Sequence, residues 1–416
     1  MGENTLFFTS VLLASAGKVY SPGGLLVSGG KILFCGDRQT ASLFAPTGTK
    51  KVDLPGTVLF PGFVNAHTHL TIPPLPEQPD KDFVGWLLEV MRLRVEKGHN
   101  EFREYADESL RECVESGVTL AAEISGGGIV RFDEARIRLR VYLELLGMTE
   151  ERWRESSEHI ESSLNASGEC GDMVRMGLSP HSLYTCSKEA LLWARELCGR
   201  RGVPCQIHFA ESLPELEYIR SGGGEIKERI YSAFSISDGD FSGYGEGLTD
   251  ILKESIPSGA ALVHVTCLSR EELDSLGKAG FSFVICVRSN RYLTGQVPKL
   301  DAVVDGGYLF GVGTDSRGSC GRIDMFEELR SAADAYHGSL KSKELYQRLF
   351  AGATSGGAEI AGFSDICGSL DEGKMADFCA LEISSGKERV FSDIIEKGEG
   401  KHIADVRVSG ESLMGF

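Results

Sequence analysis

The chain has 416 residues, with 43 Lys and Arg against 60 Asp and Glu, and carries a net charge of −17 at pH 7. This length suits two or three average domains, or one large α/β barrel with an accessory domain. The acidic balance argues against a nucleic-acid or anionic-membrane partner, because both bind basic surfaces. The eleven Cys are irregularly spaced without a CxxC pair, which is typical of buried thiols in a reducing cytosol.

The first 57 residues are predicted to form short β-strands separated by turns, with Gly29-Gly30 as a hairpin signal. The apolar run at 6–13 resembles the core of a signal peptide, but only Glu3 carries a side-chain charge before it, so we expect a β-strand there. No run approaches the roughly 18 to 20 apolar residues that span a bilayer. We therefore expect a cytoplasmic protein without a membrane partner.

From Val58 onward, eight apolar runs of strand length alternate with segments of helical periodicity. This alternation is what a closed parallel (β/α)8 barrel requires, because each of its strands is buried on both faces. The helices include 101–116, 187–200 with Ser187 as N-cap, and 269–279 with a Ser269–Glu272 capping box. The strand runs are 58–66, 118–124, 138–146, 174–179, 203–209, 259–265, 280–287 and 308–314.

The chain ends differ from the barrel region. Short strands return after Leu370, and the Gly-, Ser- and Asp-rich stretch 221–257 is expected to be an insertion in the fifth connection. The sequence thus predicts an α/β fold in which a TIM barrel spans 58–367. A small β-sandwich domain is built from both termini, residues 1–57 and 368–416.

Polar residues follow the predicted barrel strands at the end where such barrels carry their functional groups. The first run ends in His67 and His69, which an i, i+2 spacing places on one face of a strand. Any one of these His, taken alone, is explained equally well as a buried ring bonded to backbone, but their convergence favours a metal site. Imidazole and carboxylate ligands suit zinc or iron. The later runs end in or just before His181, His208, Glu211, His264 and Asp315.

Five phrases in chain order closely resemble the amidohydrolase superfamily: PGFVNAHTHL (61–70), GLSPHSLYT (177–185), HFAES (208–212), LVHVTCLS (262–269) and GTDS (313–316). The branch they resemble holds adenosine-type, S-adenosylhomocysteine and guanine deaminases and chlorotriazine hydrolases. Segments 82–94, 141–147, 286–293 and 313–330 look most like aminodeoxyfutalosine deaminases of the alternative menaquinone pathway. The resemblance implies hydrolytic deamination of an aminopurine ring in a small nucleoside-like substrate, and a homo-oligomer.

The resemblance also implies roles for the rim residues. His67, His69, His208 and Asp315 would hold one divalent ion, zinc or iron, which activates a water to hydroxide. The end of strand four carries no Lys, which favours a mononuclear site. Glu211 would protonate the ring nitrogen beside the attacked carbon and His264 would orient the hydroxide, whose proton passes to Asp315. For Glu211 alone, a helix N-terminal carboxylate is an alternative explanation.

The sequence motifs that would contact the substrate are less specific than those of the metal ligands. The resemblance implies contacts from a lid segment after strand one and from the ends of strands three, four and seven, where amphipathic packing, a structural carboxylate or a backbone-bonded His are alternatives. Aminodeoxyfutalosine is the preferred substrate. The alternatives are another adenosine, S-adenosylhomocysteine, methylthioadenosine or guanine deaminase, a chlorohydrolase, or a non-catalytic barrel homologue that binds ligands. The implied contact residues are Trp86, Arg92, Arg94, Glu144, His181, Ser289 and Asn290.

Overall fold

The computed structural model describes residues 3–75, 82–125, 136–166 and 171–414. Eight strands follow the eight predicted runs and form two four-stranded parallel sheets, in the orders β6-β7-β8-β9 and β10-β11-β12-β13. Most of their residues are buried on both faces, as a barrel wall requires. The strands are β6 (Phe63–Thr68), β7 (Val118–Ser125), β8 (Arg138–Leu145), β9 (Val174–Pro180), β10 (Gln206–Phe209), β11 (Ala261–His264), β12 (Ser282–Ile285) and β13 (Phe310–Val312).

Hydrogen bonds join the two sheets at both seams. A parallel bridge between Leu178 and Cys205 links β9 to β10. At the other seam, the side-chain amide of Asn65 in β6 accepts from the Thr314 N–H at 3.0 Å and donates to the Thr314 hydroxyl at 2.8 Å. This side chain extends the ladder beyond the short strand β13, so the eight strands enclose one interior.

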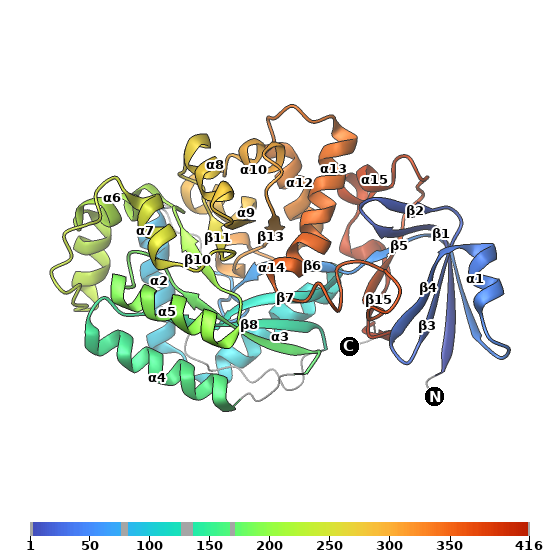
Figure 1. Ribbon diagram of the computed structural model, residues 1–416, viewed down its shortest axis with the longest axis horizontal. Coiled ribbons are helices and arrows are strands. Elements are labelled where there is room, and N and C mark those ends of the chain that lie inside the picture. The colour runs from blue at the N-terminus through green and yellow to red at the C-terminus, as the bar shows by residue number, and fades with distance from the viewer. Residues whose placement is uncertain (1–2, 76–81, 126–135, 167–170, 415–416) are drawn as a thin grey trace.

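Helices surround the barrel in Figure 1. Two predicted starts are confirmed: Ser187 caps α5, and Ser269 with Glu272 forms the capping box of α8. The predicted insertion contains a π-helical turn (Ile226–Tyr231) and a short helix, and the Tyr231 hydroxyl donates to the carbonyl of Tyr184 beside the barrel rim. The helices of the barrel region are α2 (Phe83–Glu96), α3 (His99–Glu115), α4 (Glu150–Ala166), α5 (Lys188–Arg201), α6 (Leu213–Ser221), α7 (Leu248–Ser255), α8 (Arg270–Lys278), α9 (Val287–Thr294), α10 (Leu300–Asp305), α11 (Arg317–Cys320), α12 (Met325–Ala335), α13 (Ser342–Ala351) and α14 (Gly357–Ile360).

Strands from both termini share one mixed sheet at one end of the molecule (Figure 1). Its order is β16-β15-β14-β5-β1-β3-β4, with β2 paired to β1, which confirms a β domain assembled from both ends. The predicted hairpin is also confirmed, since Gly29 and Gly30 connect β3 to β4 with φ of 54° and 79°. The elements are β1 (Asn4–Ser15), β2 (Lys18–Tyr20), β3 (Gly23–Ser28), β4 (Lys31–Asp37), α1 (Arg38–Phe44), β5 (Lys50–Pro61), β14 (Phe378–Glu382), α15 (Val390–Lys397), β15 (Ile403–Val408) and β16 (Glu411–Ser412).

The first predicted run, 58–66, is wrong as a single barrel strand. Residues 58–61 continue β5 and pair with β14, for example Phe60 with Cys379, while β6 begins only at Phe63. The chain crosses between the two sheets at Gly62, where a Cβ would lie 2.2 Å from the Thr119 side chain. Terminal sheet and first barrel strand are both buried, so their hydrophobicity runs on without a break. We propose 58–367 as the barrel domain, which then begins with the last four residues of β5, still in the terminal sheet.

A buried ion pair ties the barrel to the terminal sheet. The Arg138 guanidinium, at the start of β8, is fully buried and donates to both carboxylate oxygens of Asp377, at 2.5 and 2.9 Å. It also donates to the Ser409 hydroxyl at 2.9 Å.

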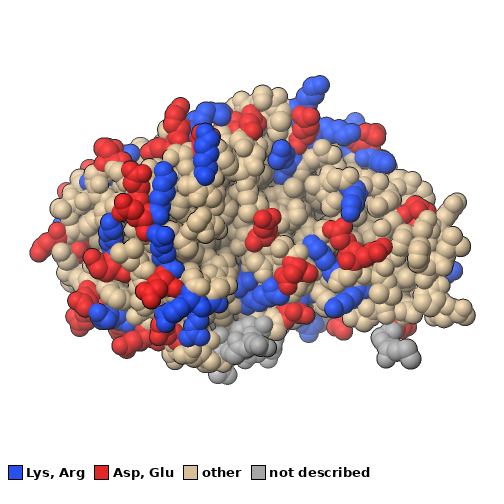
Figure 2. Space-filling view, viewed as in Figure 1, with Lys and Arg blue, Asp and Glu red and all other residues tan. Residues whose placement is uncertain are grey.

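On the face drawn in Figure 2, acidic and basic side chains are interspersed. Among the described residues, no helix is long and apolar enough to cross a membrane.

Candidate metal centre and active site

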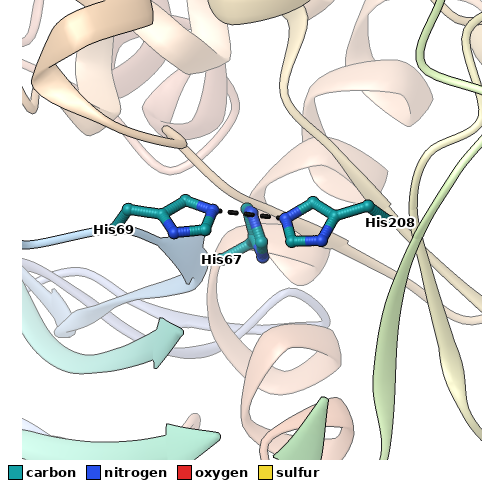
Figure 3. Close-up of side chains that lie close together, drawn as sticks. All are labelled: His67, His69 and His208. Carbon is teal, nitrogen blue, oxygen red and sulfur yellow. Dashed lines mark hydrogen bonds between the residues drawn. The ribbon is translucent and has the colours of Figure 1, made fainter. Parts of the chain in front are cut away.

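Three His rings from opposite walls of the barrel face one another at the rim. His67 and His69 come from the end of β6, and His208 comes from β10. The Nε2 atoms of His69 and His208 are 3.2 Å apart, and Figure 3 shows their rings aimed at each other with His67 between them. The i, i+2 spacing predicted from sequence therefore places both β6 rings on the inner side of the strand.

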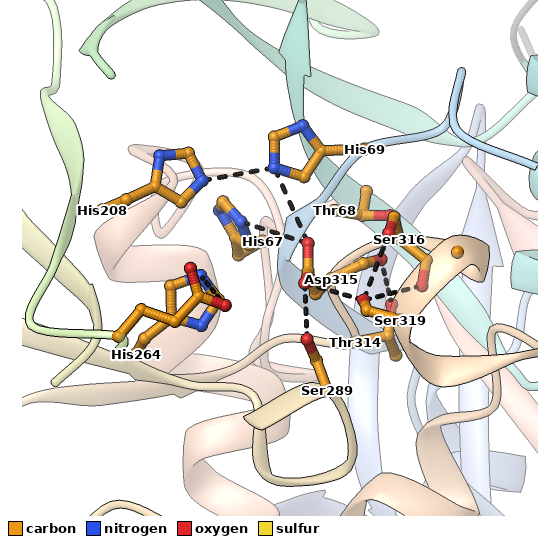
Figure 4. A network of polar contacts seen from close by, with 12 residues as sticks. His67, Thr68, His69, His208, His264, Ser289, Thr314, Asp315, Ser316 and Ser319 are labelled. Atoms are coloured by element: carbon orange, nitrogen blue, oxygen red, sulfur yellow. Dashed lines mark hydrogen bonds and ion pairs between the residues drawn. The ribbon is translucent and has the colours of Figure 1, made fainter. Parts of the chain in front are cut away.

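Asp315 completes this group from the segment after β13. Its Oδ1 lies 3.6 Å from His69 Nε2 and 3.8 Å from His67 Nε2. Its Oδ2 accepts from the hydroxyls of Ser289, at 2.6 Å, and Ser319, at 2.8 Å. Figure 4 shows the carboxylate held between the serines on one side and the histidines on the other. The serines thus occupy one oxygen and leave the other to face the rings.

The ligand atoms of His67, His69 and His208 lie within 4.8 Å of one another, and with the Asp315 carboxylate beside them they offer ligands suited to a divalent ion. Ligand atoms about 2.0–2.2 Å from zinc in a tetrahedral site lie roughly 3.3–3.6 Å apart. The separation of 3.2 Å between His69 and His208, and those of 3.6 and 3.8 Å from Asp315 to His69 and His67, are close to this. The Nε2 of His67 is buried without a hydrogen-bond partner. Burial lowers the pKa of His67 to about 4 and that of His208 to about 3, so both rings are neutral at pH 7, as a metal ligand must be.

Glu211 and His264 lie beside this group. Burial, together with the nearby Asp315 carboxylate, raises the pKa of Glu211 well above its usual range. Its Oε1 is 3.7 Å from His264 Nε2, and the side-chain amide of Asn290 donates to the other ring nitrogen, Nδ1, at 3.0 Å. His264 therefore presents an N–H toward Glu211. The ring sits on a residue with φ of 74°, a left-handed conformation that turns it inward from the end of β11.

The start of helix α6 explains why the Glu211 carboxyl does not cap that helix. Ser212 and Glu215 form the capping box, so the capping role that a carboxylate could play there is already filled. The buried Glu215 carboxylate accepts the backbone N–H of Ala210 at 2.9 Å and of Glu211 at 2.7 Å. The Glu211 side chain instead lines the cavity beside the histidines.

A cavity opens above this group and encloses about 520 Å3 of empty space, part of it open to solvent. His181 lines this cavity, and its Nδ1 is 2.9 Å from the Thr185 hydroxyl.

Two residues of helix α2, Trp86 and Arg94, also line the cavity. Trp86 donates from its ring N–H to the carbonyl of Gly318 at 3.0 Å. Arg94 pairs with Glu144 at 3.3 Å, and the second oxygen of that buried Glu has no hydrogen-bond partner.

Four predicted substrate contacts do not line the cavity, and one of them, Glu144, is instead bonded to the cavity-lining Arg94. Arg92 is exposed and pairs with Glu89, because it sits on the outer face of α2. Ser289 and Asn290 are not at a strand end but in the first turn of α9, since β12 stops at Ile285. Neither lines the cavity; they bond to Asp315 and His264, and so act on the predicted catalytic groups instead of on substrate.

Sequence reasoning missed three polar residues that hold the site. Glu215 and Ser319 carry local signals, because a Ser-x-x-Glu box precedes α6 and a hydroxyl follows Asp315 by one helical turn. Gln206 is bonded to His67 at 3.0 Å, but 139 residues separate the two. No spacing in the sequence could have indicated that contact.

Comparison with known proteins settles the family. The model of the amidohydrolase family matches residues 58–413. The chain belongs to the amidohydrolase family. This confirms the predicted hydrolase class, the resemblance, and the α/β barrel with an accessory β domain.

This amidohydrolase is 27% identical over 412 residues to a 5-methylthioadenosine/S-adenosylhomocysteine deaminase of Pelotomaculum thermopropionicum, covering 95% of the chain and 89% of the relative. It is 28% identical to an aminodeoxyfutalosine deaminase of Deinococcus radiodurans, covering 80% and 81%. Its fold matches Helicobacter pylori aminofutalosine deaminase in complex with methylthio-coformycin, with a TM-score of 0.84 at 22% identity, over 99% and 100% of the chains.

Proposed function

We propose that this amidohydrolase removes the amino group of an adenine-type ring by hydrolysis, replacing C–NH2 with C=O and releasing ammonia. The observation that carries the proposal is the buried Glu211 carboxyl, poised 3.7 Å from His264 next to a neutral three-histidine cluster. The names of the curated relatives, deaminases of methylthioadenosine, S-adenosylhomocysteine and aminodeoxyfutalosine, support the same reaction.

The metal would be held by His67, His69, His208 and Asp315. We assign one ion, because the end of β9 offers Ser179 and no Lys that could bridge a second. Imidazole and carboxylate ligands accept either zinc or iron. When bound, such an ion lowers the pKa of a water toward neutrality and supplies the nucleophile for hydrolysis.

The remaining groups move protons. Burial raises the pKa of Glu211 and so favours its protonated form, which can donate to the ring nitrogen beside the attacked carbon. His264 directs its Nε2–H to the same side of the cavity and orients the attacking oxygen. Asp315, whose Oδ2 is bonded to two hydroxyls, would offer one lone pair of Oδ1 as a ligand and the other to accept the proton that the nucleophile loses. Glu211 then takes the proton of the substrate hydroxyl that becomes C=O and passes it to the amino group, which departs as ammonia, and the proton held by Asp315 restores Glu211.

One face of helix α2 forms a wall of the cavity that would bind the substrate. The cavity-lining residues of α2 recur at helical spacing, and all are apolar until the last, Arg94. An apolar wall that ends in a guanidinium suits a nucleoside whose sugar carries an apolar group with a carboxylate, which is the chemistry of aminodeoxyfutalosine. His181 would contact a sugar hydroxyl, and Glu144, which does not line the cavity, would hold Arg94 in place. The lining residues of α2 are Phe83, Trp86, Leu87, Val90, Met91 and Arg94.

An ammonia-release screen over adenosine, methylthioadenosine, S-adenosylhomocysteine, guanine and aminodeoxyfutalosine tests the proposal, with Glu211→Gln as control. We expect aminodeoxyfutalosine to give the highest kcat/KM, and the variant to retain its metal without turnover. A tenfold preference for methylthioadenosine or S-adenosylhomocysteine would overturn the substrate. Full turnover by Glu211→Gln would overturn the role of that carboxyl, and no ammonia from any compound by metal-loaded enzyme would overturn deamination.

A further inference from the structure

Gln206 is a buried amide that no step of the proposed reaction uses. It is the first residue of β10, is fully buried, and reaches across the barrel interior to β6, four strands away in the ring. Its side-chain Nε2 donates to the carbonyl of Ala66 at 2.8 Å, and its Oε1 lies 3.0 Å from Nδ1 of His67. Both polar atoms of this buried amide therefore bond to residues of β6, which indicates that Gln206 acts on that strand.

The bond to Ala66 fixes the direction of the amide. A carbonyl oxygen only accepts, so the group facing it must be the NH2, and the amide oxygen must face His67. That oxygen also only accepts, so His67 must carry its proton on Nδ1. The lone pair of the neutral ring then lies on Nε2, the buried atom without a hydrogen-bond partner that faces Asp315.

His208 shows the same arrangement with a backbone partner. Its Nδ1 is 2.9 Å from the carbonyl of His181, which again places the proton on Nδ1 and the lone pair on Nε2. In His208 the partner is main chain and no substitution removes it. In His67 the partner is a side chain, so the effect of fixing the tautomer can be measured.

We propose that Gln206 is a positioning residue for the metal: it locks His67 in the Nδ1–H tautomer, so that the barrel holds a ligand lone pair ready before the ion arrives. This rests on the metal site proposed above. Partners of this kind fix ring orientation and raise ligand basicity, and their loss typically costs ~10–100-fold in metal affinity.

Two substitutions separate this role from a contribution to folding. Gln206→Leu removes both contacts, whereas Gln206→Glu keeps an acceptor against Nδ1 in nearly the same shape. Ser282→Ala is the matched control: Ser282 is the first residue of β12, as Gln206 is of β10, and is also buried. Its hydroxyl contacts the carbonyl of Ala260 and no rim histidine. The zinc Kd of each apoprotein is measured by competition with a chromophoric chelator.

We expect zinc binding about 10–100-fold weaker for Gln206→Leu, and within about threefold of wild type for Gln206→Glu and Ser282→Ala. A Gln206→Leu affinity within threefold of wild type would overturn the proposal. So would equal losses in the Leu and Glu variants, because the bond to Ala66 would then be what matters.

Nitrogen NMR of the wild-type apoprotein supplies a test that does not depend on folding of a variant. The proposal expects the His67 proton on Nδ1, and a proton on Nε2 overturns it. Failure of the wild-type protein to bind one equivalent of zinc would instead sink the proposed metal site and leave the tautomer result standing.

Discussion

Glu215→Gln tests how the loop that carries Glu211 is held. The Glu215 side chain is 1% exposed, and its two oxygens accept the N–H groups of Ala210 and Glu211 at 2.9 and 2.7 Å. An amide keeps one acceptor and turns its NH2 toward the other N–H. Loss of one such bond with a buried donor left over costs about 1–3 kcal/mol.

The stability difference between wild type and Glu215→Gln is expected to depend on pH. Burial raises the pKa of Glu215 from 4.5 to about 7, although three backbone N–H bonds oppose it. The folded protein therefore binds more protons than the unfolded chain between these values, so this group's contribution to stability falls as pH rises through that window. A rise of 7 − 4.5 = 2.5 pH units corresponds to about 3 kcal/mol. Glutamine lacks this titration.

We expect Glu215→Gln to be less stable than wild type by about 1–3 kcal/mol at pH 5 in urea unfolding, and the deficit to shrink or reverse at pH 8. Since the loop places the Glu211 carboxyl, kcat/KM should fall on the order of 10–100-fold. Glu217→Gln, on the exposed face of the same helix, is the control and should change neither quantity. A deficit that grows from pH 5 to pH 8 would refute the reasoning, because the carboxylate would then be the form the fold prefers.

Further predictions concern the ligand carboxylate, the lid helix and the domain contact. Ser289→Ala removes one hydroxyl from the ligand carboxylate and should weaken zinc binding on the order of tenfold in chelator competition. Arg94→Ala should raise KM for a carboxylate-bearing nucleoside at least tenfold, whereas the exposed Arg92→Ala should leave steady-state kinetics unchanged. Arg138→Leu strands a buried Asp377 carboxylate and should cost about 3–5 kcal/mol in urea unfolding, with kcat per folded molecule preserved.

Each of these has an opposite outcome. Unchanged zinc affinity in Ser289→Ala would mean that Ser319 alone holds the carboxylate. Equal kinetic effects at positions 92 and 94 would contradict the placement of the two Arg on different faces of α2. A loss below 1 kcal/mol in Arg138→Leu would show that the ion pair contributes little to the contact between barrel and sheet.

The rim histidines were predictable because a parallel barrel brings the carboxyl ends of its strands to one edge. A period of two places His67 and His69 together, and runs four, five and six each add one His to the rim: His181, His208 and His264. The helical period also separates Arg94 from Arg92: position 94 continues the 83, 87, 90 stripe that lines the cavity, and position 92 falls off it. The sequence therefore contained the spacing that separates Arg94 from Arg92, and the prediction of both as substrate contacts did not use it.

Other features follow from tertiary packing. The apolar run at 280–287 continues through Cys286 and Val287, which are buried in the turn into α9, so hydrophobicity alone could not show that β12 ends at Ile285. The split at Gly62 was hidden for the same reason, since both flanking strands are buried. The contact of Gln206 with His67 requires opposite walls of a closed barrel, and local pattern carries no information about such a pair.

One metal ion at the rim is proposed to enable deamination. Titrating zinc into the apoprotein while ammonia release from aminodeoxyfutalosine and methylthioadenosine is recorded tests this most directly. We expect activity that rises linearly to one equivalent and then stays constant. Activity that needs a second equivalent, or that is independent of added metal, would contradict it.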